Sequence, residues 1–157
     1  MNYFDILQIS IHPCPNQNLV QKQYFLLQQQ FHPDLQKNDN LNISADLNLA
    51  YQTLNNPFLS ACYWLKLQGI DIFSETCKIK PTSSILQEIF SLQNSINNNN
   101  KSVIKKNVQQ KITLALQNIL PLYENYLAKQ NNDLIDFALH LIKIQYYQKT
   151  LQNLSSK

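Results

Sequence analysis

Histidine and cysteine are the residues of this chain best suited to bind a metal ion or to attack a substrate. The three histidines, His12, His32 and His140, lack the His-x-x-x-His and Glu-x-x-His spacings of metal sites. No serine or cysteine has a recognisable base beside it in the sequence. The single glycine, Gly69, excludes a phosphate-binding loop, because such loops need several glycines to bring backbone N–H groups to the anion. We therefore expect no metal site, no cofactor and no intrinsic enzymatic activity, unless residues distant in the sequence converge.

The tripeptide His32-Pro33-Asp34 is the most informative short motif. Four apolar residues before it recur at intervals of four, three and four and predict an amphipathic helix: Val20, Tyr24, Leu27 and Phe31. Pro33 ends that helix, because proline lacks an N–H group and pushes the residue before it out of the helical backbone region. We therefore expect His32 and Asp34 on a solvated corner.

A polar loop and a second helix are predicted after the tripeptide. The loop, Leu35 to Asn42, is rich in asparagine, aspartate and lysine, which suit turns. A second apolar stripe follows at intervals of three, one and three: Leu47, Ala50, Tyr51 and Leu54. The two helices can then pack antiparallel, with the tripeptide at their joint.

In this helical context the tripeptide resembles the motif of the J-domain. The His-Pro-Asp motif of that domain lies between its second and third helices and stimulates the ATPase of a DnaK-type chaperone. Further segments resemble the HscB family, the J-type co-chaperones of iron-sulfur cluster assembly, over nearly the whole chain: Asn2-Tyr3-Phe4, Ala50-Tyr51-Gln52-Thr53-Leu54, a turn at Asn56-Pro57, Ala61-Cys62-Tyr63-Trp64-Leu65 and Gly69-Ile70-Asp71. The alternative is that His32 and Asp34 merely form a polar helix exit.

The resemblance implies two protein partners. In the HscB family a J-domain is joined to a C-terminal three-helix domain that binds the cluster scaffold protein, IscU, and delivers it to the specialised ATPase chaperone HscA. The resemblance assigns His32, Pro33 and Asp34 to chaperone binding. Lys22 joins them as the only charged residue between positions 21 and 30. Because the second helix of a J-domain is usually basic, we expect a slower or weaker association with the chaperone here.

The predicted fold is all-α and has two domains. Residues 1–70 form the J-domain with its helical hairpin, residues 71–82 a linker, and residues 83–157 a C-terminal antiparallel three-helix bundle. Pro81 breaks the chain, and Thr82 with Ser83 can cap the helix that follows.

Three helices are expected in the second domain. The first runs from about Ser84 to Ile96 and is followed by an Asn-rich loop. The second is kinked at Pro121 and carries a long apolar stripe: Ile104, Val108, Ile112, Ala115, Ile119, Leu122 and Tyr126. The last runs from about Asp133 to Asn153, and its predicted core stripe is Ile135, Leu139, Ile142 and Tyr146.

The first of these helices has more apolar surface than one core stripe requires. Its predicted core face is Ile85, Ile89, Leu92 and Ile96. Leu86 and Phe90 lie about 100° around the helix, one turn apart, and need another surface to cover them. That surface is either the first domain or a neighbouring helix, or else a partner protein. The HscB resemblance assigns Leu86, Phe90 and Tyr146 to scaffold binding. Tyr146 also lies on the predicted core stripe and Tyr147 lies off it, so either tyrosine could be the exposed one.

Acidic residues surround this patch in the HscB family, and this sequence departs from that pattern. Ser91, Gln93, Asn94 and Ser95 follow Phe90. Glu88 is the nearby acid. Electrostatic help to scaffold binding is therefore not expected.

Composition narrows the remaining classes. Three cysteines, Cys14, Cys62 and Cys77, are odd in number and lack Cys-x-x-Cys spacing, which argues against a disulfide framework and a zinc ribbon. The net charge is only +3 and all 13 basic residues are lysine, so a nucleic-acid partner is not expected. Without a leader segment or an apolar run of about 18 residues, we expect no membrane association and a bacterial cytoplasmic location. The second functional hypothesis is a J-domain co-chaperone for a different client protein.

Overall fold

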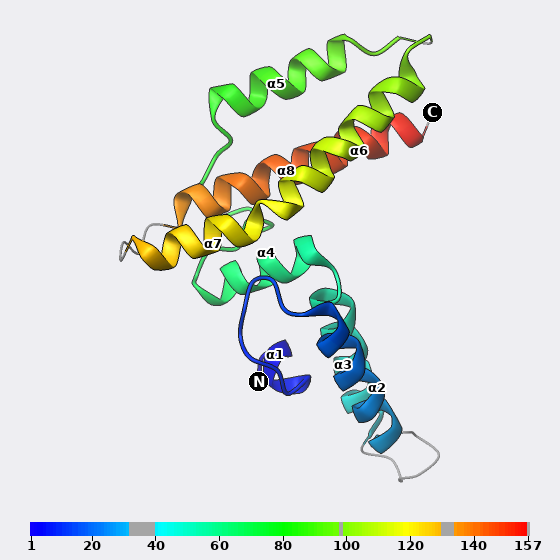
Figure 1. Ribbon diagram of the computed structural model, residues 1–157, viewed down its shortest axis with the longest axis vertical. Helices are drawn as coiled ribbons and strands as arrows, with labels where there is room; N and C mark the ends of the chain where they lie inside the picture. The colour runs from blue at the N-terminus through cyan, green and yellow to red at the C-terminus, as the bar shows by residue number, and fades with distance from the viewer. Residues whose placement is uncertain (32–39, 98, 130–133, 157) are drawn as a thin grey trace. The chain divides into compact units, whose positions relative to one another are not determined.

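The computed structural model describes residues 1–31, 40–97, 99–129 and 134–156 (Figure 1). All regular secondary structure within those ranges is helical, which confirms the predicted all-α class. The chain divides into two compact units, Met1–Gln68 and Gly69–Lys157. Each unit has its own apolar core.

Asparagine caps start three helices of the first unit. Its helices are α1 (Tyr3–Ile6), α2 (Gln17–Gln30), α3 (Asn40–Leu54) and α4 (Pro57–Leu67). Asn2 and Asp5 form a reciprocal capping box at α1, and the side chains of Asn16 and Asn56 accept backbone hydrogen bonds at the starts of α2 and α4. Pro57 is tolerated because the first N–H of a helix has no intrahelical acceptor. The predicted turn at Asn56-Pro57 is thus the start of α4.

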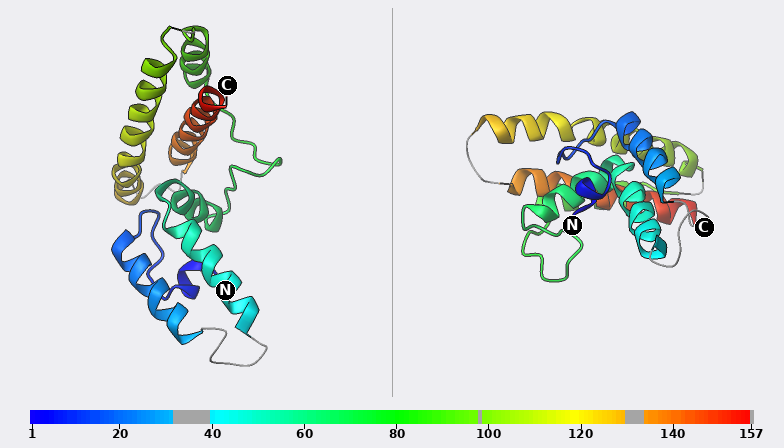
Figure 2. Two further views of the ribbon diagram at one scale, coloured as in Figure 1. Left: turned by 90° about the vertical axis from the view of Figure 1, so that its right-hand side faces the viewer. Right: turned by 90° about the horizontal axis from the view of Figure 1, so that it is seen from below.

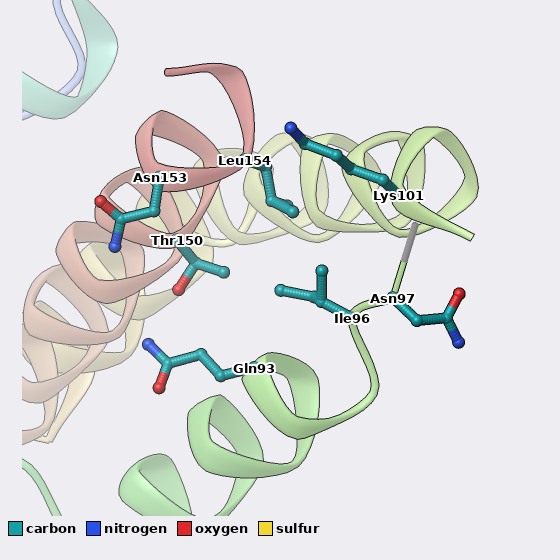
Figure 3. Close-up of a pocket in the computed structure, with 7 residues that line it drawn as sticks. All are labelled: Gln93, Ile96, Asn97, Lys101, Thr150, Asn153 and Leu154. Atoms are coloured by element: carbon teal, nitrogen blue, oxygen red, sulfur yellow. The ribbon is translucent and has the colours of Figure 1, made fainter. Parts of the chain in front are cut away.

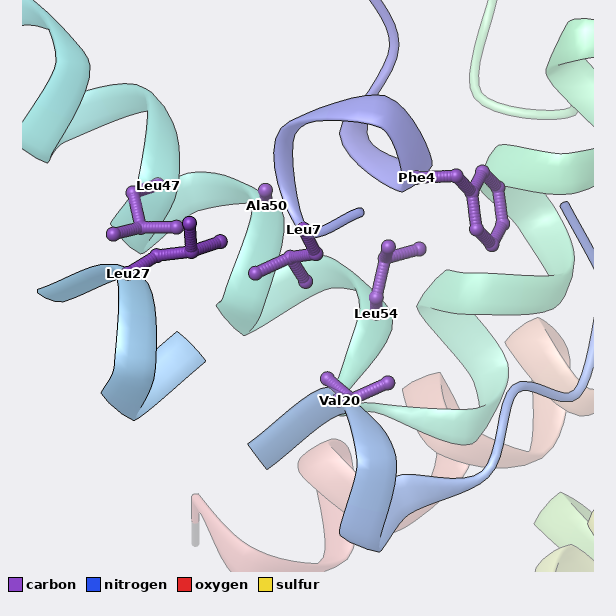
Figure 4. Packing of buried hydrophobic residues seen from close by; sticks show 7 residues of the cluster. All are labelled: Phe4, Leu7, Val20, Leu27, Leu47, Ala50 and Leu54. Atoms are coloured by element: carbon purple, nitrogen blue, oxygen red, sulfur yellow. The ribbon is translucent and has the colours of Figure 1, made fainter. Parts of the chain in front are cut away.

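The core of the first unit joins α1, α2 and α3 (Figure 4). Its buried residues are Phe4, Leu7, Val20, Leu27, Leu47, Ala50 and Leu54. The predicted stripes supply five of these seven, and their remaining members, Tyr24, Phe31 and Tyr51, are partly buried against the cluster. Both predicted stripes are therefore confirmed as the packing faces of α2 and α3, which run antiparallel side by side (Figure 2).

Tyr24 fixes how α2 and α3 lie against each other. Its ring stacks on that of Tyr51, with centroids 4.0 Å apart and an angle of 15° between the rings. Its hydroxyl donates to Asn48 Oδ1 at 2.7 Å and accepts from Gln28 Nε2 at 2.8 Å. Because both contacts depend on one register, the aromatic pair and its polar partners specify the hairpin more narrowly than aliphatic packing does.

The joint of this hairpin lies largely outside the described residues. His32, Pro33 and Asp34 fall between residues 32 and 39, and so does most of the predicted loop. The predicted end of that loop, at Asn42, is wrong, since α3 begins at Asn40. Asparagine is common in turns and also at helix starts, and sequence alone does not separate those two uses.

The second unit contains α5 (Ser83–Asn94), α6 (Lys101–Gln117), α7 (Ile119–Ala128) and α8 (Ile135–Ser155). Thr82 caps α5, accepting a hydrogen bond from the backbone N–H of Ile85 at 3.3 Å, as predicted. In the Asn-rich loop, Asn97 Oδ1 accepts from the backbone N–H groups of Asn99 and Asn100 at 3.0 and 3.1 Å. The core where α5, α6 and α8 meet contains the buried residues Ile85, Ile89, Val108, Tyr147 and Leu154.

The predicted long second helix is broken into α6 and α7 at Asn118. Pro121 lies three residues beyond the break and has no N–H to donate to the carbonyl of Gln117. The N–H of Asn118 is shared between the carbonyls of Leu114 and Ala115, both at 3.2 Å, which tightens the last turn of α6. The structure thus confirms an interruption near Pro121 and places it one turn earlier.

The predicted core stripe of the last helix is only partly right. Ile142 is buried and Tyr146 is partly buried against the core, whereas Ile135 is 50% exposed. The buried side of α8 instead includes Phe137, Ala138, Leu141, Ile144, Tyr147 and Leu154. Apolar residues lie on several sides of this helix, so its sequence is compatible with more than one core face. Tertiary packing selects among them.

Ser60 on α4 provides a test of the packing in the first unit. Its side chain is fully buried, and its hydroxyl oxygen has no hydrogen-bond partner among the described residues. Since a buried unpaired hydroxyl is destabilising, Ser60→Ala should raise the free energy of unfolding by about 1 kcal/mol. Urea unfolding followed by fluorescence of the single tryptophan, the buried Trp64, measures this unit directly.

The matched control is Ser44→Ala on α3, where the serine is half-buried. That variant should gain only the difference in helix propensity, roughly 0.5 kcal/mol or less. A loss of stability in Ser60→Ala would show that the hydroxyl is paired in solution.

Candidate functional site

Leu86 and Phe90 form an exposed apolar pair on α5. Their side chains are 46% and 64% exposed, although Ile85 and Ile89 on the adjacent face are buried in the bundle core. This confirms the predicted division of α5 into a core face and a second apolar face. The pair borders an open groove of about 450 Å³ between α5 and α8, lined by Leu86, Gln87, Ile89, Phe90, Gln93 and Tyr146. We call this the α5–α8 groove.

The structure decides which tyrosine of α8 belongs to the groove. Tyr147 is only 3% exposed and lies in the bundle core, whereas Tyr146 is half-buried and lines the groove. Tyr146 also packs against the bundle core, so its predicted core position is confirmed in part. Lys149 Nζ lies 5.7 Å from the centroid of the Tyr146 ring, within range of a cation–π contact.

Glu88 connects α5 to both neighbouring helices. Lys111 Nζ on α6 lies 3.0 Å from Glu88 Oε1, and Lys143 Nζ on α8 lies 3.1 Å from Oε2. The hydroxyl of Tyr147 donates to Oε1 at 2.5 Å. One carboxylate therefore accepts hydrogen bonds from two ammonium groups and one hydroxyl, which orients α5 on α6 and α8.

These contacts decide the charge state of Glu88. Burial by itself raises the pKa of this carboxyl, but the hydrogen bonds from Tyr147, Lys111 and Lys143 outweigh it and lower the pKa from 4.5 to about 2. Burial, together with the bond to Glu88, raises the pKa of Tyr147 above its ordinary value. At neutral pH the pair is therefore a carboxylate and a neutral phenol.

A second pocket, of about 400 Å³, lies at the end of the bundle (Figure 3). It is lined by Gln93, Ile96, Asn97, Lys101, Thr150, Asn153 and Leu154. Gln93 also lines the α5–α8 groove. The hydroxyl of Thr150 donates a hydrogen bond to the carbonyl oxygen of Tyr146 at 3.0 Å. The remaining polar groups of the lining are mostly amides. The lining thus combines amide groups with a lysine and has no cluster of charged side chains.

The chaperone-binding prediction falls partly within the described residues. Lys22 is exposed on α2, and the tripeptide lies outside them. The sequence analysis missed three exposed apolar residues on the same helix: Leu19, Phe25 and Leu26, which are 42%, 51% and 45% exposed. The interval of seven between Leu19 and Leu26, off the core stripe, was the available signal.

His140 has a structural contact. Its Nε2 lies 2.7 Å from the carbonyl oxygen of Ala115 and must carry the proton, because a carbonyl only accepts. Burial lowers the pKa of His140, the bond to Ala115 acts in the opposite direction, and the charge of Lys143 lowers it further. Within residues 1–31, 40–97, 99–129 and 134–156, no group of three histidine, cysteine or acidic side chains could hold a metal ion. In the same ranges no helix combines the length and apolarity needed to cross a membrane.

Sequence comparison finds relatives with one shared description, although no family model matches the chain. The chain is 35% identical over 96 residues to the Co-chaperone protein HscB homolog of Psychromonas ingrahamii, with 57% of each chain covered. It is 35% identical over 101 residues to Co-chaperone protein HscB of Proteus mirabilis, covering 57% of this chain and 56% of the relative. The chain thus matches little more than half the length of these curated relatives. With Co-chaperone protein HscB of Buchnera aphidicola it is 28% identical over 169 residues, covering 98% of this chain and 97% of the relative.

These relatives support the HscB family for this chain. Three solved structures share its fold. Chaperone HscB from Vibrio cholerae has a TM-score of 0.71 at 22% identity, covering 99% of this chain and 96% of the other. Human co-chaperone protein HscB has a TM-score of 0.80 at 22% identity, covering 99% and 81%. The Jac1 co-chaperone of Saccharomyces cerevisiae has a TM-score of 0.78 at 19% identity, covering 99% and 93%. The chain therefore shares its fold with these three proteins at low sequence identity.

Glu88→Gln tests the carboxylate that holds α5. The variant keeps the shape of the side chain but loses the charge, so we expect the second unit to lose about 1–2 kcal/mol at pH 7. The pKa of Glu88 is lower in the folded protein, so its contribution is complete above about pH 4.5 and is lost as the pH falls towards about 2. The stability difference between wild type and variant should shrink across that window.

Thermal unfolding followed by circular dichroism at several pH values measures this difference. Glu124→Gln, at an exposed position of α7, is the control and should leave the pH profile close to that of the wild type. A difference between Glu88→Gln and wild type that is constant from pH 7 to pH 2 would contradict the role of the charge.

Proposed function

We propose that this chain is a co-chaperone of iron-sulfur cluster assembly. Its second unit binds an IscU-type scaffold protein through Leu86, Phe90 and Tyr146, and residues 83–157 form this scaffold-binding domain. Its first unit acts as a J-domain, residues 1–70, that stimulates ATP hydrolysis by an HscA-type or DnaK-type chaperone. Residues 71–82 link the two. The observation that carries the proposal is the exposed Leu86–Phe90 pair beside Tyr146, in a chain whose relatives are HscB co-chaperones.

The apolar groove supports scaffold binding on physical grounds. Phe90 exposes 64% of its side chain in the free protein, and burying an aromatic side chain of this kind is strongly favourable. Gln87 and Gln93, also in the lining, offer amide hydrogen bonds at the edge of the apolar centre. An apolar centre with a polar edge is the usual composition of a protein–protein interface.

The chaperone would be engaged by His32, Pro33 and Asp34, with Lys22 contributing the charge on α2. Binding scaffold and chaperone through one chain raises the effective concentration of client at the chaperone, because the second binding step becomes intramolecular. The ATP is hydrolysed by the chaperone, so the chain itself is a regulator and not an enzyme. On this proposal it acts in the bacterial cytoplasm, with neither nucleic acid nor membrane as a partner.

Phe90→Ala should weaken binding of the scaffold protein by roughly 30-fold, the effect of removing a central aromatic contact worth about 2 kcal/mol. Isothermal titration with the IscU-type scaffold of the same organism measures the loss. Leu114→Ala is the matched control, because Leu114 is 60% exposed on α6 and lies outside the groove. Equal affinities for Phe90→Ala and wild type would exclude the groove as the scaffold site.

His32→Gln should abolish stimulation of the chaperone and leave scaffold binding intact. Single-turnover ATP hydrolysis by the HscA-type chaperone, with the chain, the scaffold, or both, measures stimulation. Asp34→Asn should act in the same direction, and Asp136→Asn, at an exposed position of α8, is the control for losing a carboxylate.

The pattern of stimulation separates the two functional hypotheses. Synergy between chain and scaffold that disappears in His32→Gln supports the proposed function. Stimulation that ignores the scaffold would instead favour a J-domain co-chaperone with a different client, and stimulation retained by His32→Gln would contradict the role of the tripeptide.

A further inference from the structure

One positively charged side chain contacts the lining of the α5–α8 groove. Lys149 is exposed, and its Nζ lies 5.7 Å from the centroid of the Tyr146 ring. Lys111 and Lys143 bind Glu88 instead, and Glu88 lies about 200° around α5 from both Leu86 and Phe90. The charge at the edge of the groove is therefore that of Lys149.

Glu88 is not available to attract a basic partner. Its oxygens already accept hydrogen bonds from Lys111, Lys143 and the hydroxyl of Tyr147, and those contacts lie on the bundle side of α5. Turning the carboxylate towards a partner would leave the Tyr147 hydroxyl, in the core, without its acceptor. A carboxylate that neutralises lysines within its own fold contributes little outward field.

The neutral residues at the groove leave this positive edge unbalanced. Gln87 and Gln93 line the groove as uncharged amides, and the apolar centre carries no charge. Among the described residues, Lys149 contacts the groove-lining Tyr146. Unlike Lys111 and Lys143, it makes no ion pair with Glu88. Its contact with the Tyr146 ring places the ammonium at the rim, where an incoming protein surface would meet it.

We propose that the surface docking in this groove is apolar at its centre and carries carboxylates at the edge that meets Lys149. The inference rests on the proposed function, in which the docking protein is the cluster scaffold. Lys149 is then a specificity-determining residue: it accelerates encounter with an acidic-edged scaffold and disfavours one with a basic edge. The apolar contacts of Phe90 and Leu86 provide the affinity, and Lys149 discriminates between partners with an acidic edge and partners with a basic edge.

Charge reversal at Lys149 tests the inference. The probe is the IscU-type scaffold of the same organism, and association rates with the full-length chain are measured by stopped flow at 0.1 M and 1 M salt. Lys149→Glu should associate at least about threefold more slowly than wild type at 0.1 M salt and nearly equally at 1 M, where the screening length falls from about 10 Å to about 3 Å. Lys149→Arg should retain the wild-type rate.

A matched control uses the same charge change away from the groove. Lys106 is exposed on α6, about 200° around the helix from the core-packed Ile104. Lys106→Glu should change the association rate less than twofold. This comparison removes the effect of net charge alone.

The dependence on salt separates recognition from structure. If Lys149 acted only by holding the Tyr146 ring, Lys149→Glu would bind more weakly by the same factor at both salt concentrations, and the inference would be overturned. Association of Lys149→Glu at or above the wild-type rate at 0.1 M would overturn it as well. Phe90→Ala, run in parallel, tests the groove itself. Wild-type affinity of Phe90→Ala for the scaffold would refute the proposed site. Weakened binding of Phe90→Ala together with a wild-type association rate of Lys149→Glu would refute only the acidic edge.

Discussion

The second unit depends on how α5 is attached to the rest of its bundle. One face of this short helix, with Ile85 and Ile89, is buried, while the adjacent face stays exposed. Apolar packing alone permits a helix to slide or roll by small amounts, because it has no directional requirement. Glu88 adds direction, since its two oxygens meet separate lysines on α6 and α8. The α5–α8 groove depends on this attachment, because it lies between α5 and α8.

In the first unit aromatic groups fix the relative position of the helices. The ring of Tyr24 on α2 stacks on Tyr51 of α3, and its hydroxyl donates to Asn48 of α3. Near α1, the Tyr63 hydroxyl accepts the backbone N–H of Tyr3 at 3.1 Å, and the two rings stack with centroids 4.3 Å apart. Tyrosine suits this purpose because a single side chain combines a large apolar face with a directional polar end. In both units the apolar core stabilises the packing of the helices, and a polar contact with fixed geometry specifies their relative position.

Local sequence patterns predicted much of this fold. Intervals of three and four identified the buried faces of α2, α3 and α5. The off-stripe positions of Leu86 and Phe90 identified a second apolar face, but the sequence left open what covers it, and the structure shows it exposed. The same reasoning failed on α8, where Ile135 and Ile144 are both apolar but only Ile144 is buried. Periodicity identifies a face when the opposite face is polar, and α8 does not meet that condition. Contacts between distant residues, such as Glu88 with Lys111, leave no local pattern at all. The spacing of three between Tyr146 and Lys149 was readable, because such neighbours share a helix face.

The exposed Phe90 also bears on the behaviour of the unbound protein in solution. An apolar pair on a surface favours self-association, and a two-fold contact would bring the same patch of two copies together. That contact would also bring the rim lysines of both copies close to one another, beside a chain whose net charge is already +3. Repulsion between these like charges weakens the pairing, so that a higher protein concentration is needed before it occurs. The charge of Lys149 therefore disfavours self-association through the exposed apolar pair.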